Sequence, residues 1–462
     1  MISCGKWRLI REVSCDHTSK VYFAESMETL EKRMVKTINN QYIDRLEEED
    51  KHKIAIMTGL DHPNLIKTYD YEFEADIEDS SIRNEPHCLL VSETITVTKL
   101  FEIISFTGPF SEKISRYYFH QILDAIIYLS DQGINQLDLR ADNLFLDNEY
   151  NLKIGDYTQA LLRDYNKTII STDVTQAPEC SIYKENDKLS FECVNMFAIG
   201  VILFMMVVGK KPFVSSENNY SIYKTLNSIR SEKFWHKHLA EFPEKLQFLS
   251  LEIKELITLL LSHDPYERPS LTELTELEWY NESLPTGQEV KEEIYAKIRQ
   301  LDDINVTIEE EFPDISDAQD IFYRIEYPYR GVYDEDIEEI EERICEAYIP
   351  EFKTYTQFFS TSEINTLFEA LVVYANMLSS DIYYGKSTYS CTYHRIVEES
   401  EPSSLLITVN ILSVEDDLHC VQVIKKSGCI FHFAKEYKEI TKFFGGHCNQ
   451  IPPTQPLFKD FG

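Results

Sequence analysis

The amino-acid sequence predicts an α+β protein with a small β-rich lobe, a larger helical lobe and a further α/β module after an acidic linker. Residues 7–38 alternate in short apolar runs broken by polar turns, which is typical of a β-meander. Residues 195–280 have the apolar spacing of helices, and strand-like runs return only after residue 362. Strands followed by helices favour two packed lobes of different class, with the last segment as a separate unit.

Composition and charge limit the functions that the chain can have. Of its 462 residues, 43% are hydrophobic and 12% aromatic, which is enough for packed cores. The length favours two or three domains of about 100–200 residues each. The formal net charge of -34 disfavours sequence-independent binding to nucleic acid, which relies on Lys and Arg, so we expect no nucleic-acid partner.

Cysteine spacing and hydropathy indicate a cytoplasmic protein. The ten cysteines include no CxxC pair, so we expect reduced thiols rather than a metal cluster or a disulfide framework. The first residues carry no apolar stretch long enough for a signal peptide. The most apolar run, residues 194–209, is shorter than the ~20 residues of a membrane span, and a buried helix is the better interpretation.

The first lobe is expected to consist mainly of strands. The runs WRLIREV (7–13), KVYFAES (20–26) and RMVKTI (33–38) predict three strands, and HCLLVSE (87–93) predicts a buried one. Residues 41–59 are charged and have a helical pattern.

The second lobe is expected to begin with a long helix. Apolar residues recur at helical spacing between residues 114 and 130, and Gly133 follows the end of the pattern. The short β runs NLFL and NLKIG then flank a turn around Asp147 and Asn148.

The last part of the chain predicts an acidic linker and a second ordered unit. Residues 301–345 carry sixteen acidic residues against three basic ones, which is typical of a solvated linker with short helices. A helical stretch (362–378) precedes the strand-like runs YSCTYHRI, SLLITVNIL, HCVQVI and CIFHF, and a helix is expected at about 434–444. The predicted organisation is a first domain at 1–282, a linker at 283–350, an α/β module at 351–450 and a flexible tail at 451–462.

The strongest functional pattern is the segment QLDLRADNLFLDNEYNLKIGDYTQA at residues 136–160. Phosphoryl transfer needs a carboxylate near the acceptor hydroxyl and oxygen ligands for Mg²⁺. Asp138, Asn143 and Asp156 carry such groups. The segment resembles the catalytic loop and DFG motif of the protein kinases, with HRDxKxxN written as QLDLRADN and DFG written as Asp156-Tyr157-Thr158.

Other landmarks of the protein kinase family follow in order. Lys36 matches the third-strand lysine that holds the nucleotide phosphates, DHPNLIKTYD (61–70) matches the strand after the C-helix, and LLVSETITVTKLFEII (89–104) matches the hinge. Ala177-Pro178-Glu179 resembles the APE motif, and Arg268 matches the arginine that pairs with this glutamate. The resemblance covers about residues 1–280 and implies the bilobal protein-kinase fold.

The resemblance also implies cofactors, partners and residue roles. ATP and Mg²⁺ are the implied cofactors, and a protein is the implied substrate or partner. Asp138 would receive the proton of the acceptor hydroxyl, with Arg140 beside it, and Asn143 and Asp156 would hold Mg²⁺. The implied nucleotide-binding residues are Val13, Val21, Met34, Lys36, Glu93, Ile95, Asn143 and Asp156. Thr168 and Thr172 fall in the activation segment, and Glu179 and Arg268 form a structural pair.

Several N-lobe positions depart from the family pattern and predict weakened catalysis. Residues 14–19 read SCDHTS where the family has GxGxxG, so backbone N–H groups close less freely over phosphates, and Asp16 adds a negative charge. Met34 replaces a small residue and would crowd the adenine. Lys53 occupies the position of the C-helix glutamate. Two like charges would then face each other, unless Glu49, one turn earlier, pairs with Lys36 instead.

The catalytic loop and the activation segment also differ. Gln136 and Leu137 replace His and Arg, so a phosphate on Thr168 would lack its bidentate arginine and should matter little. Thr158 replaces the glycine of DFG, which makes a backbone flip costlier. Lys99 replaces the acidic residue after the hinge that in relatives touches the ribose or a basic substrate side chain.

Further features resemble one branch of the family. Thr172 matches the threonine that braces the catalytic loop of serine/threonine kinases, although Arg140 stands where those kinases carry lysine. FWHKH (234–238) and LTELEWYNESLPT (274–286) resemble the calcium/calmodulin-dependent group and its AMP-activated-kinase-like branch. Residues 404–444 resemble the kinase-associated 1 domain found at the C-terminus of that branch.

The last module carries a basic patch in an acidic chain. It consists of Lys425 and Lys426 in a predicted turn and of Lys435, Lys438 and Lys442 on the last predicted helix. Acidic phospholipid headgroups would be attracted to such a patch, and so would the acidic linker, as an intramolecular contact between tail and kinase. The alternative is a solvated helix face with acidic residues interspersed.

Two functions fit these observations. The first is an ATP- and Mg²⁺-dependent protein serine/threonine kinase of intracellular signalling with weakened catalysis, because the side chains that handle transition-state charge persist. The second is a pseudokinase that acts as a scaffold or allosteric regulator. The lost glycines and the missing His-Arg pair favour it, since small displacements of catalytic groups are costly in rate.

Overall fold

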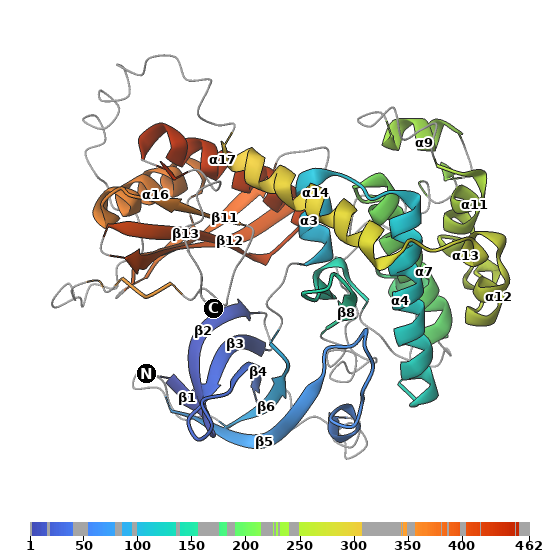
Figure 1. Cartoon of the computed structure of the whole chain (residues 1–462), viewed down its shortest axis with the longest axis horizontal. Helices are drawn as coiled ribbons and strands as arrows, with labels where there is room; N and C mark the ends of the chain where they lie inside the picture. Colours follow the sequence, from blue (N-terminus) through green and yellow to red (C-terminus); the bar gives the residue numbers. More distant parts are fainter. Residues whose placement is uncertain are drawn as a thin grey trace. The chain divides into compact units, whose positions relative to one another are not determined.

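The computed structural model divides into two compact units, Met1–Ile294 and Tyr295–Gly462 (Figure 1). The residues that the structure describes are 2–15, 19–39, 54–78, 86–94, 99–134, 139–155, 175–182, 190–213, 225, 228–229, 232–239, 249–306, 343, 345–348, 356–379, 381–385, 388–397, 403–415, 417–448 and 450–451. The helix predicted within 41–59 and most of the acidic linker therefore lie outside the described residues.

Six strands of the first unit form a closed antiparallel barrel (Figure 1). They are β1 (Ile2–Cys4), β2 (Trp7–Cys15), β3 (Ser19–Ser26), β4 (Lys32–Asn39), β5 (Thr68–Glu78) and β6 (Pro86–Ser92). The order around the barrel is β1-β2-β3-β4-β6-β5, and β1 closes it by pairing with both β2 and β5. Four predicted strands are present as β2, β3, β4 and β6. The strand matched to residues 61–70 begins only at Thr68, as β5, and no sequence pattern predicts the three-residue strand β1.

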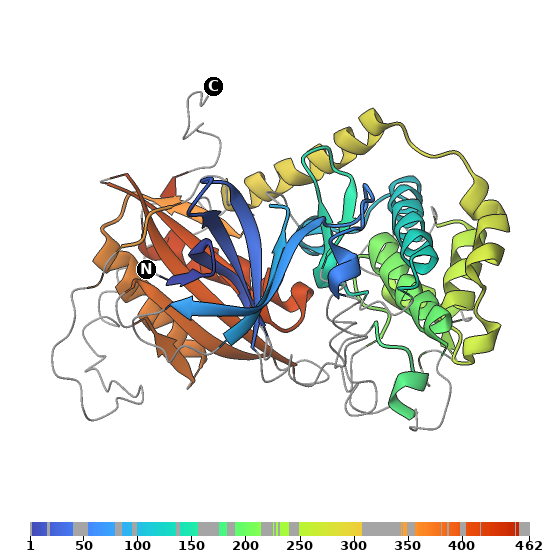
Figure 2. The ribbon, with the colours of Figure 1, turned by 90° about the horizontal axis from the view of Figure 1, so that it is seen from below.

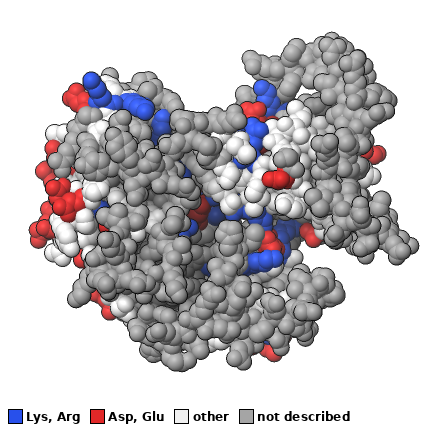
Figure 3. Space-filling view, turned by 180° about the vertical axis from the view of Figure 1, so that it is seen from behind, with Lys and Arg blue, Asp and Glu red and all other residues white. Residues whose placement is uncertain are grey.

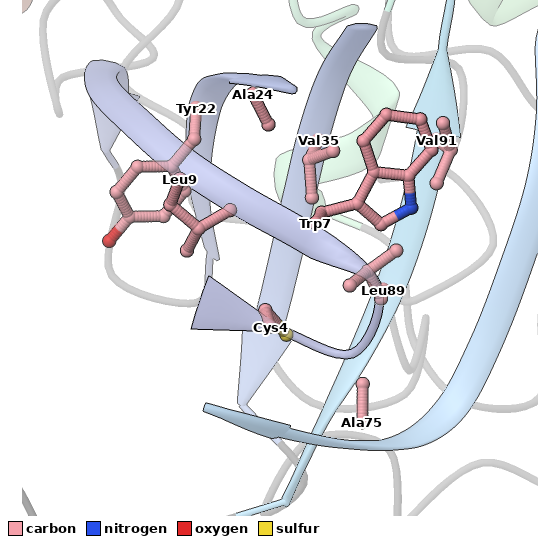
Figure 4. Close-up of a cluster of buried hydrophobic side chains, with 9 residues drawn as sticks. All are labelled: Cys4, Trp7, Leu9, Tyr22, Ala24, Val35, Ala75, Leu89 and Val91. Carbon is pink, nitrogen blue, oxygen red and sulfur yellow. The ribbon is translucent and has the colours of Figure 1, made fainter. Parts of the chain in front are cut away.

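The barrel interior is a hydrophobic core (Figure 4). Trp7, Val35 and Val91 come from three different strands, point toward one another and are each at most 5% exposed. The buried cluster consists of Cys4, Trp7, Leu9, Tyr22, Ala24, Val35, Ala75, Leu89 and Val91. Because side chains alternate between the two faces of a strand, the residues on either side of Val35 along β4 point out of the barrel.

Helices dominate the rest of the first unit (Figure 2). In chain order the elements are α3 (Leu100–Thr107), α4 (Glu112–Asp131), the 3-10 turn η1 (Ala141–Asn143), β7 (Leu144–Leu146), β8 (Leu152–Ile154), α6 (Glu179–Ile182), α7 (Phe191–Val208), α9 (Glu232–His238), α11 (Leu251–Leu260), the 3-10 turn η2 (Pro265–Glu267), α12 (Leu271–Glu276) and α13 (Glu278–Asn281). Strands β7 and β8 form a two-stranded hairpin, as the runs NLFL and NLKIG predict.

Helix α7 is the apolar centre of the helical lobe. Its residues 195–208 are all buried. Ser190 caps the start by accepting the N–H of Cys193, and Gly209 ends the helix with a left-handed φ of 79° that suits glycine. By length and composition alone this helix could cross a membrane, but 78% of it is buried inside the fold, in agreement with the predicted buried helix.

Helix α14 (Gly287–Val306) contains the boundary between the two units. Its first two turns, up to Ile294, belong to the first unit, and the remainder belongs to the second.

The second unit is a six-stranded antiparallel sheet with two helices on one face (Figure 1). Its elements are β9 (Gln357–Ser360), α16 (Ile364–Leu378), β10 (Ile382–Tyr384), β11 (Ser390–Val397), β12 (Ser403–Glu415), β13 (Leu418–Ser427), α17 (Ile430–His447) and β14 (Gln450–Ile451). The strand order is β10-β11-β12-β13-β9-β14. Helix α16 contacts β11 and β12, α17 contacts β13, and the two helices contact each other.

One predicted strand of this unit is wrong. The run CIFHF (429–433) forms the beginning of α17 rather than a strand. Ile430, Phe433, Ala434 and Tyr437 are buried at the i, i+3, i+4, i+7 spacing of a helix face. The helix expected at about 434–444 therefore begins four residues earlier and ends at His447.

Candidate functional site

The predicted phosphate-binding lysine lies on β4 of the barrel. Lys36 is directly opposite Val21 of β3 and Leu90 of β6, and it is only 9% exposed. Residues directly opposite each other in an antiparallel sheet share a face, so all three point away from the barrel core. Met34, two residues earlier, lies on this same outer face between Phe23 and Ser92. The structure thus brings together three predicted nucleotide-site residues: Val21, Met34 and Lys36.

The end of β2 leads toward this face. The pairing of β2 with β3 shifts register between Glu12 and Ser14, which places half-buried Val13 at a β-bulge. Asp16 belongs to the residues 16–18 between the two strands, which lie outside the described part of the chain.

The hinge glutamate makes contacts that its motif position does not reveal. The Glu93 carboxylate accepts the backbone N–H of Lys67 (2.9 Å) and the Nζ of Lys153 (2.8 Å). Lys153 lies on β8, so the carboxylate ties the hinge to the strand that leads to Asp156. Ile95, predicted to contact the nucleotide, lies outside the described residues.

The segment before β5 is bound to β8 along its length. Leu65 forms a parallel bridge with Ile154, and Ile66 N–H donates to the Ile154 carbonyl (2.9 Å). Asn64 donates its side-chain amide to the Leu152 carbonyl (2.8 Å), and its own carbonyl accepts the Ile154 N–H (2.8 Å). These bonds fasten the β-rich lobe to the hairpin of the catalytic loop.

The catalytic-loop segment ends in a tight turn that meets β8. Arg140 precedes the 3-10 turn Ala141–Asn143, and the N–H of Gly155 donates to the carbonyl of Asn143 (2.8 Å). This bond brings together the backbone of one predicted Mg²⁺ ligand and the residue before the other, Asp156. Asp138 and Asp156 lie outside the described residues, as do Lys53, Glu49, Gln136, Leu137 and Thr158.

Phe145 is a site residue that the sequence analysis missed. A Cβ on Gly155 would lie 2.5 Å from Ile66 Cδ1 and 2.8 Å from Phe145 Cε2, so glycine is needed for the ring to approach. The backbone of Lys99 forms an isolated antiparallel β-bridge with Phe145. The Lys99 Nζ lies 5.9 Å from the centroid of the Phe145 ring, which is a cation–π contact. The sequence signal that could have indicated Phe145 is that it is the one aromatic residue in the run NLFL.

The activation segment ends in a buried ion pair. Arg268 Nη1 donates to Glu179 Oε1 (2.6 Å), and Nη2 donates to Glu179 Oε2 (2.8 Å). Arg268 also donates to the carbonyls of Cys193 (2.8 Å) and Ser262 (2.9 Å), and its guanidinium lies 5.0 Å from the Phe197 ring centroid. The residues matched to the APE glutamate and its arginine are therefore brought together. Thr168 and Thr172 lie outside the described residues.

The predicted basic patch lies at the end of β13 and along α17, so Lys425 and Lys426 belong to a strand and the predicted turn at these residues is wrong. Lys435, Lys438 and Lys442 are exposed on the helix, whereas Lys425 and Lys426 are half-buried, and the Lys425 Nζ donates to the Gly428 carbonyl (3.1 Å). Figure 3 shows one face of the molecule, on which described Lys and Arg side chains lie among Asp and Glu side chains.

Comparison with known proteins identifies the class of protein that this fold and site define. Residues 15–280 match the family model described as protein kinase domain. This match spans more than half of the chain, and the chain belongs to the protein kinase family. The predicted family and the predicted two-lobed kinase fold are confirmed.

The relatives that it resembles include protein kinases named for interaction with CBL. The chain is 25% identical over 453 residues to CBL-interacting protein kinase 32 of Oryza sativa subsp. japonica, covering 95% of this chain and 94% of the relative. It is 26% identical over 452 residues to CBL-interacting serine/threonine-protein kinase 3 of Arabidopsis thaliana, covering 95% and 93%. The similarity thus extends well beyond the kinase domain.

Protein kinases use ATP and Mg²⁺, and the residues present fit both groups. Mg²⁺ prefers oxygen ligands, and the Asn143 amide and the Asp156 carboxylate both carry such oxygens. The hydrogen bond from the Gly155 N–H to the Asn143 carbonyl joins the two segments that contain these residues. The Lys36 side chain points to the outer face of the barrel sheet, and its amine would pair with phosphate oxygens. When bound, the metal would neutralise negative charge on the phosphates during transfer. Within the described residues, no group of three or more His, Cys, Asp or Glu side chains forms another metal site.

Proposed function

We propose that this chain is an ATP- and Mg²⁺-dependent protein serine/threonine kinase of cytoplasmic signalling whose phosphoryl transfer is weakened. The observation that carries the proposal is the hydrogen bond from Gly155 N–H to the Asn143 carbonyl (2.8 Å). It joins the two segments whose side chains would hold the metal. The sequence retains both residue types that hold the metal in protein kinases, Asn143 and Asp156, which supports phosphoryl transfer over its complete loss.

The retained side chains would divide the work as follows. Lys36 would orient the nucleotide phosphates, and Asn143 and Asp156 would hold Mg²⁺ against them. Asp138 would accept the proton of the acceptor hydroxyl, as a general base must lie within hydrogen-bond reach of that proton. Arg140, two residues later, would interact with the transferred group.

The weakening follows from the parts that grip the nucleotide. The SCDHTS sequence offers phosphates fewer accessible N–H groups than a glycine-rich loop, and Asp16 repels them. Met34 projects from the same face as Val21 and Lys36 and takes up space where a small residue would leave room for a base. Both effects reduce nucleotide affinity before they reduce the rate of the chemical step.

Serine and threonine are the proposed acceptors. Thr172 matches the bracing threonine of serine/threonine kinases, and the relatives named above include a serine/threonine-protein kinase that aligns over 95% of this chain. Those relatives are named for interaction with CBL proteins. We therefore propose that this chain also binds a regulatory protein partner of that kind.

We further propose a role for the basic patch of Lys425, Lys426, Lys435, Lys438 and Lys442. It would bind acidic phospholipid or the chain's own acidic residues 301–345. Co-sedimentation of the full chain with phosphatidylserine vesicles would test the first of these, with the three helix lysines changed to glutamine as control. Vesicle binding that is unaffected by those changes would contradict a role for the patch.

A thermal-shift titration followed by a transfer assay tests the main proposal. Mg²⁺ and ATP together should raise the unfolding midpoint, because a ligand that binds only the native state must stabilise it. Transfer to a Ser/Thr peptide library should then be lost in Asp138→Asn and Asp156→Asn. Absence of a shift at millimolar nucleotide would contradict the proposal.

The second candidate function is a pseudokinase scaffold. Met34 on the nucleotide face is the observation that favours it. Absence of a midpoint shift at millimolar nucleotide would select this function over the first, and so would a shift without measurable transfer.

A further inference from the structure

The beginning of helix α14 is packed against the kinase unit. Val290 is 2% exposed and Ile294 is 0% exposed. The helix starts with a reciprocal cap, in which Thr286 N–H donates to the Glu289 carboxylate (2.6 Å) and Glu289 N–H donates to Thr286 Oγ1 (3.3 Å). Residues 287–294 therefore form a capped helical segment that is packed into the first unit.

This segment holds the N-terminus of α4. The Glu293 carboxylate accepts both the backbone N–H of Ser111 (2.8 Å) and its hydroxyl (2.6 Å), and Lys113 Nζ donates to Glu289 (2.7 Å). Ser111 is also the N-cap of α4, since its Oγ accepts the N–H of Ile114 (3.3 Å). The Ser111–Glu293 contact thus joins the start of one helix to the side of another.

The same segment reaches the turn of the β7–β8 hairpin. Lys291 pairs with Glu149 in that turn. The turn itself is well defined, because Asp147 Oδ1 accepts the N–H groups of Glu149 (2.9 Å) and Asn151 (2.8 Å). Helix α4 also contacts the turn, because the Tyr118 hydroxyl donates to the Tyr150 carbonyl (3.1 Å).

The two ends of the β7–β8 hairpin make different contacts. Its turn contacts α14 and α4, and its open end carries Asn143 and Gly155, which are hydrogen-bonded to each other. Only three residue pairs separate the turn from the open end. A displacement of the turn is therefore transmitted along the ladder to the segments that carry the predicted metal ligands.

We infer that residues 287–294 of α14 are a positioning element for the catalytic hairpin: by holding its turn and the start of α4, they fix the geometry of the Asn143–Gly155 junction. The inference rests on the proposed function only for the role of that junction in phosphoryl transfer.

A charge introduced at Ser111 tests the inference. Ser111→Asp keeps a side chain that caps helices well but sets a carboxylate against Glu293 in place of a hydroxyl donor. Hydrogen exchange of the full chain without nucleotide should become about tenfold faster in residues 287–294 and also in residues 141–155. The paired variant Ser111→Asp with Glu293→Gln removes the repulsion and should restore slow exchange in both segments.

Two controls separate positioning from general destabilisation. Ser111→Asn caps the helix and can donate to Glu293, so exchange in the hairpin should remain as in the natural chain. Lys291→Glu should loosen the hairpin turn, and adding Glu149→Lys should reverse the effect.

The inference is overturned if residues 287–294 open in Ser111→Asp while residues 141–155 keep their protection, because the helix would then be only an attachment. It is equally overturned if neither segment responds. Since no nucleotide is present, a chain that fails to bind ATP would leave these outcomes unchanged, and the proposed function is tested separately.

Discussion

The ion pair between Arg268 and Glu179 allows a quantitative prediction. The Arg268 side chain is fully buried and that of Glu179 is 13% exposed. Arg268→Ala removes two hydrogen bonds to the carboxylate and one each to the carbonyls of Cys193 and Ser262. Breaking a buried pair by removing one partner costs about 3–5 kcal/mol, because the other charge is left desolvated. Arg268→Lys should lose roughly half as much, since lysine cannot make the bidentate contact.

Unfolding of the first unit can be followed selectively. All three tryptophans, Trp7, Trp235 and Trp279, belong to this unit, and each is at most 6% exposed. Guanidinium unfolding monitored by tryptophan fluorescence therefore gives its free energy of unfolding without interference from the second unit. The midpoint of thermal unfolding should fall by roughly 6–20 °C in Arg268→Ala.

A double-mutant cycle decides whether the pair itself is responsible. If the ion pair itself stabilises the fold, the double variant Glu179→Ala with Arg268→Ala should lose clearly less free energy of unfolding than the sum of the two single variants. Additive losses, or a loss below about 1 kcal/mol in Arg268→Ala, would refute the reasoning.

Three further changes probe other contacts of the first unit. Glu93→Ala should lower the free energy of unfolding by about 1.5–3 kcal/mol, because Lys153 and a backbone N–H lose a charged acceptor, and Lys153→Ala should couple to it in a double-mutant cycle. Gly155→Ala should cost about 1–3 kcal/mol through its clash with Ile66 and Phe145, and Phe145→Leu should recover part of the loss, as measured by the same fluorescence. Burial lowers the pKa of His238 to about 4, so the unfolded chain binds more protons below pH 6.5; stability should fall as the pH drops from 6.5 to 4, and His238→Gln should flatten this dependence in guanidinium unfolding at several pH values.

Sequence patterns located the parts of the site that depend on local motifs. Lys36, Asn143, Glu179 and Arg268 occupy positions that the kinase motifs define along the chain, and the structure sets Lys36 on the expected strand and pairs Arg268 with Glu179. Such residues can be predicted because the motif order specifies the fold. The spacing of apolar residues also predicted correctly whether a long segment forms a strand or a helix.

Contacts between distant segments could not be predicted in this way. The Glu93 carboxylate binds Lys153, sixty residues later, and Ser111 binds Glu293, 182 residues later, and no local pattern encodes either pair. The closure of the barrel by β1 depends likewise on pairing with residues 77 and 78. The run CIFHF was misassigned because four apolar residues around one histidine fit a strand or a buried helix equally well, and burial against the neighbouring sheet decided between them.

A calorimetric titration of the full chain with Mg²⁺ and ATP tests the central claim most directly. The claim is that a kinase nucleotide site persists with a weakened hold on phosphate. We predict saturable binding with a dissociation constant in the upper part of the ~1 μM–1 mM range common for enzymes and their substrates. Lys36→Met, which keeps the size of the side chain but removes its charge, should abolish this binding. No heat of binding at millimolar nucleotide, or binding that is unaffected by Lys36→Met, would contradict the claim.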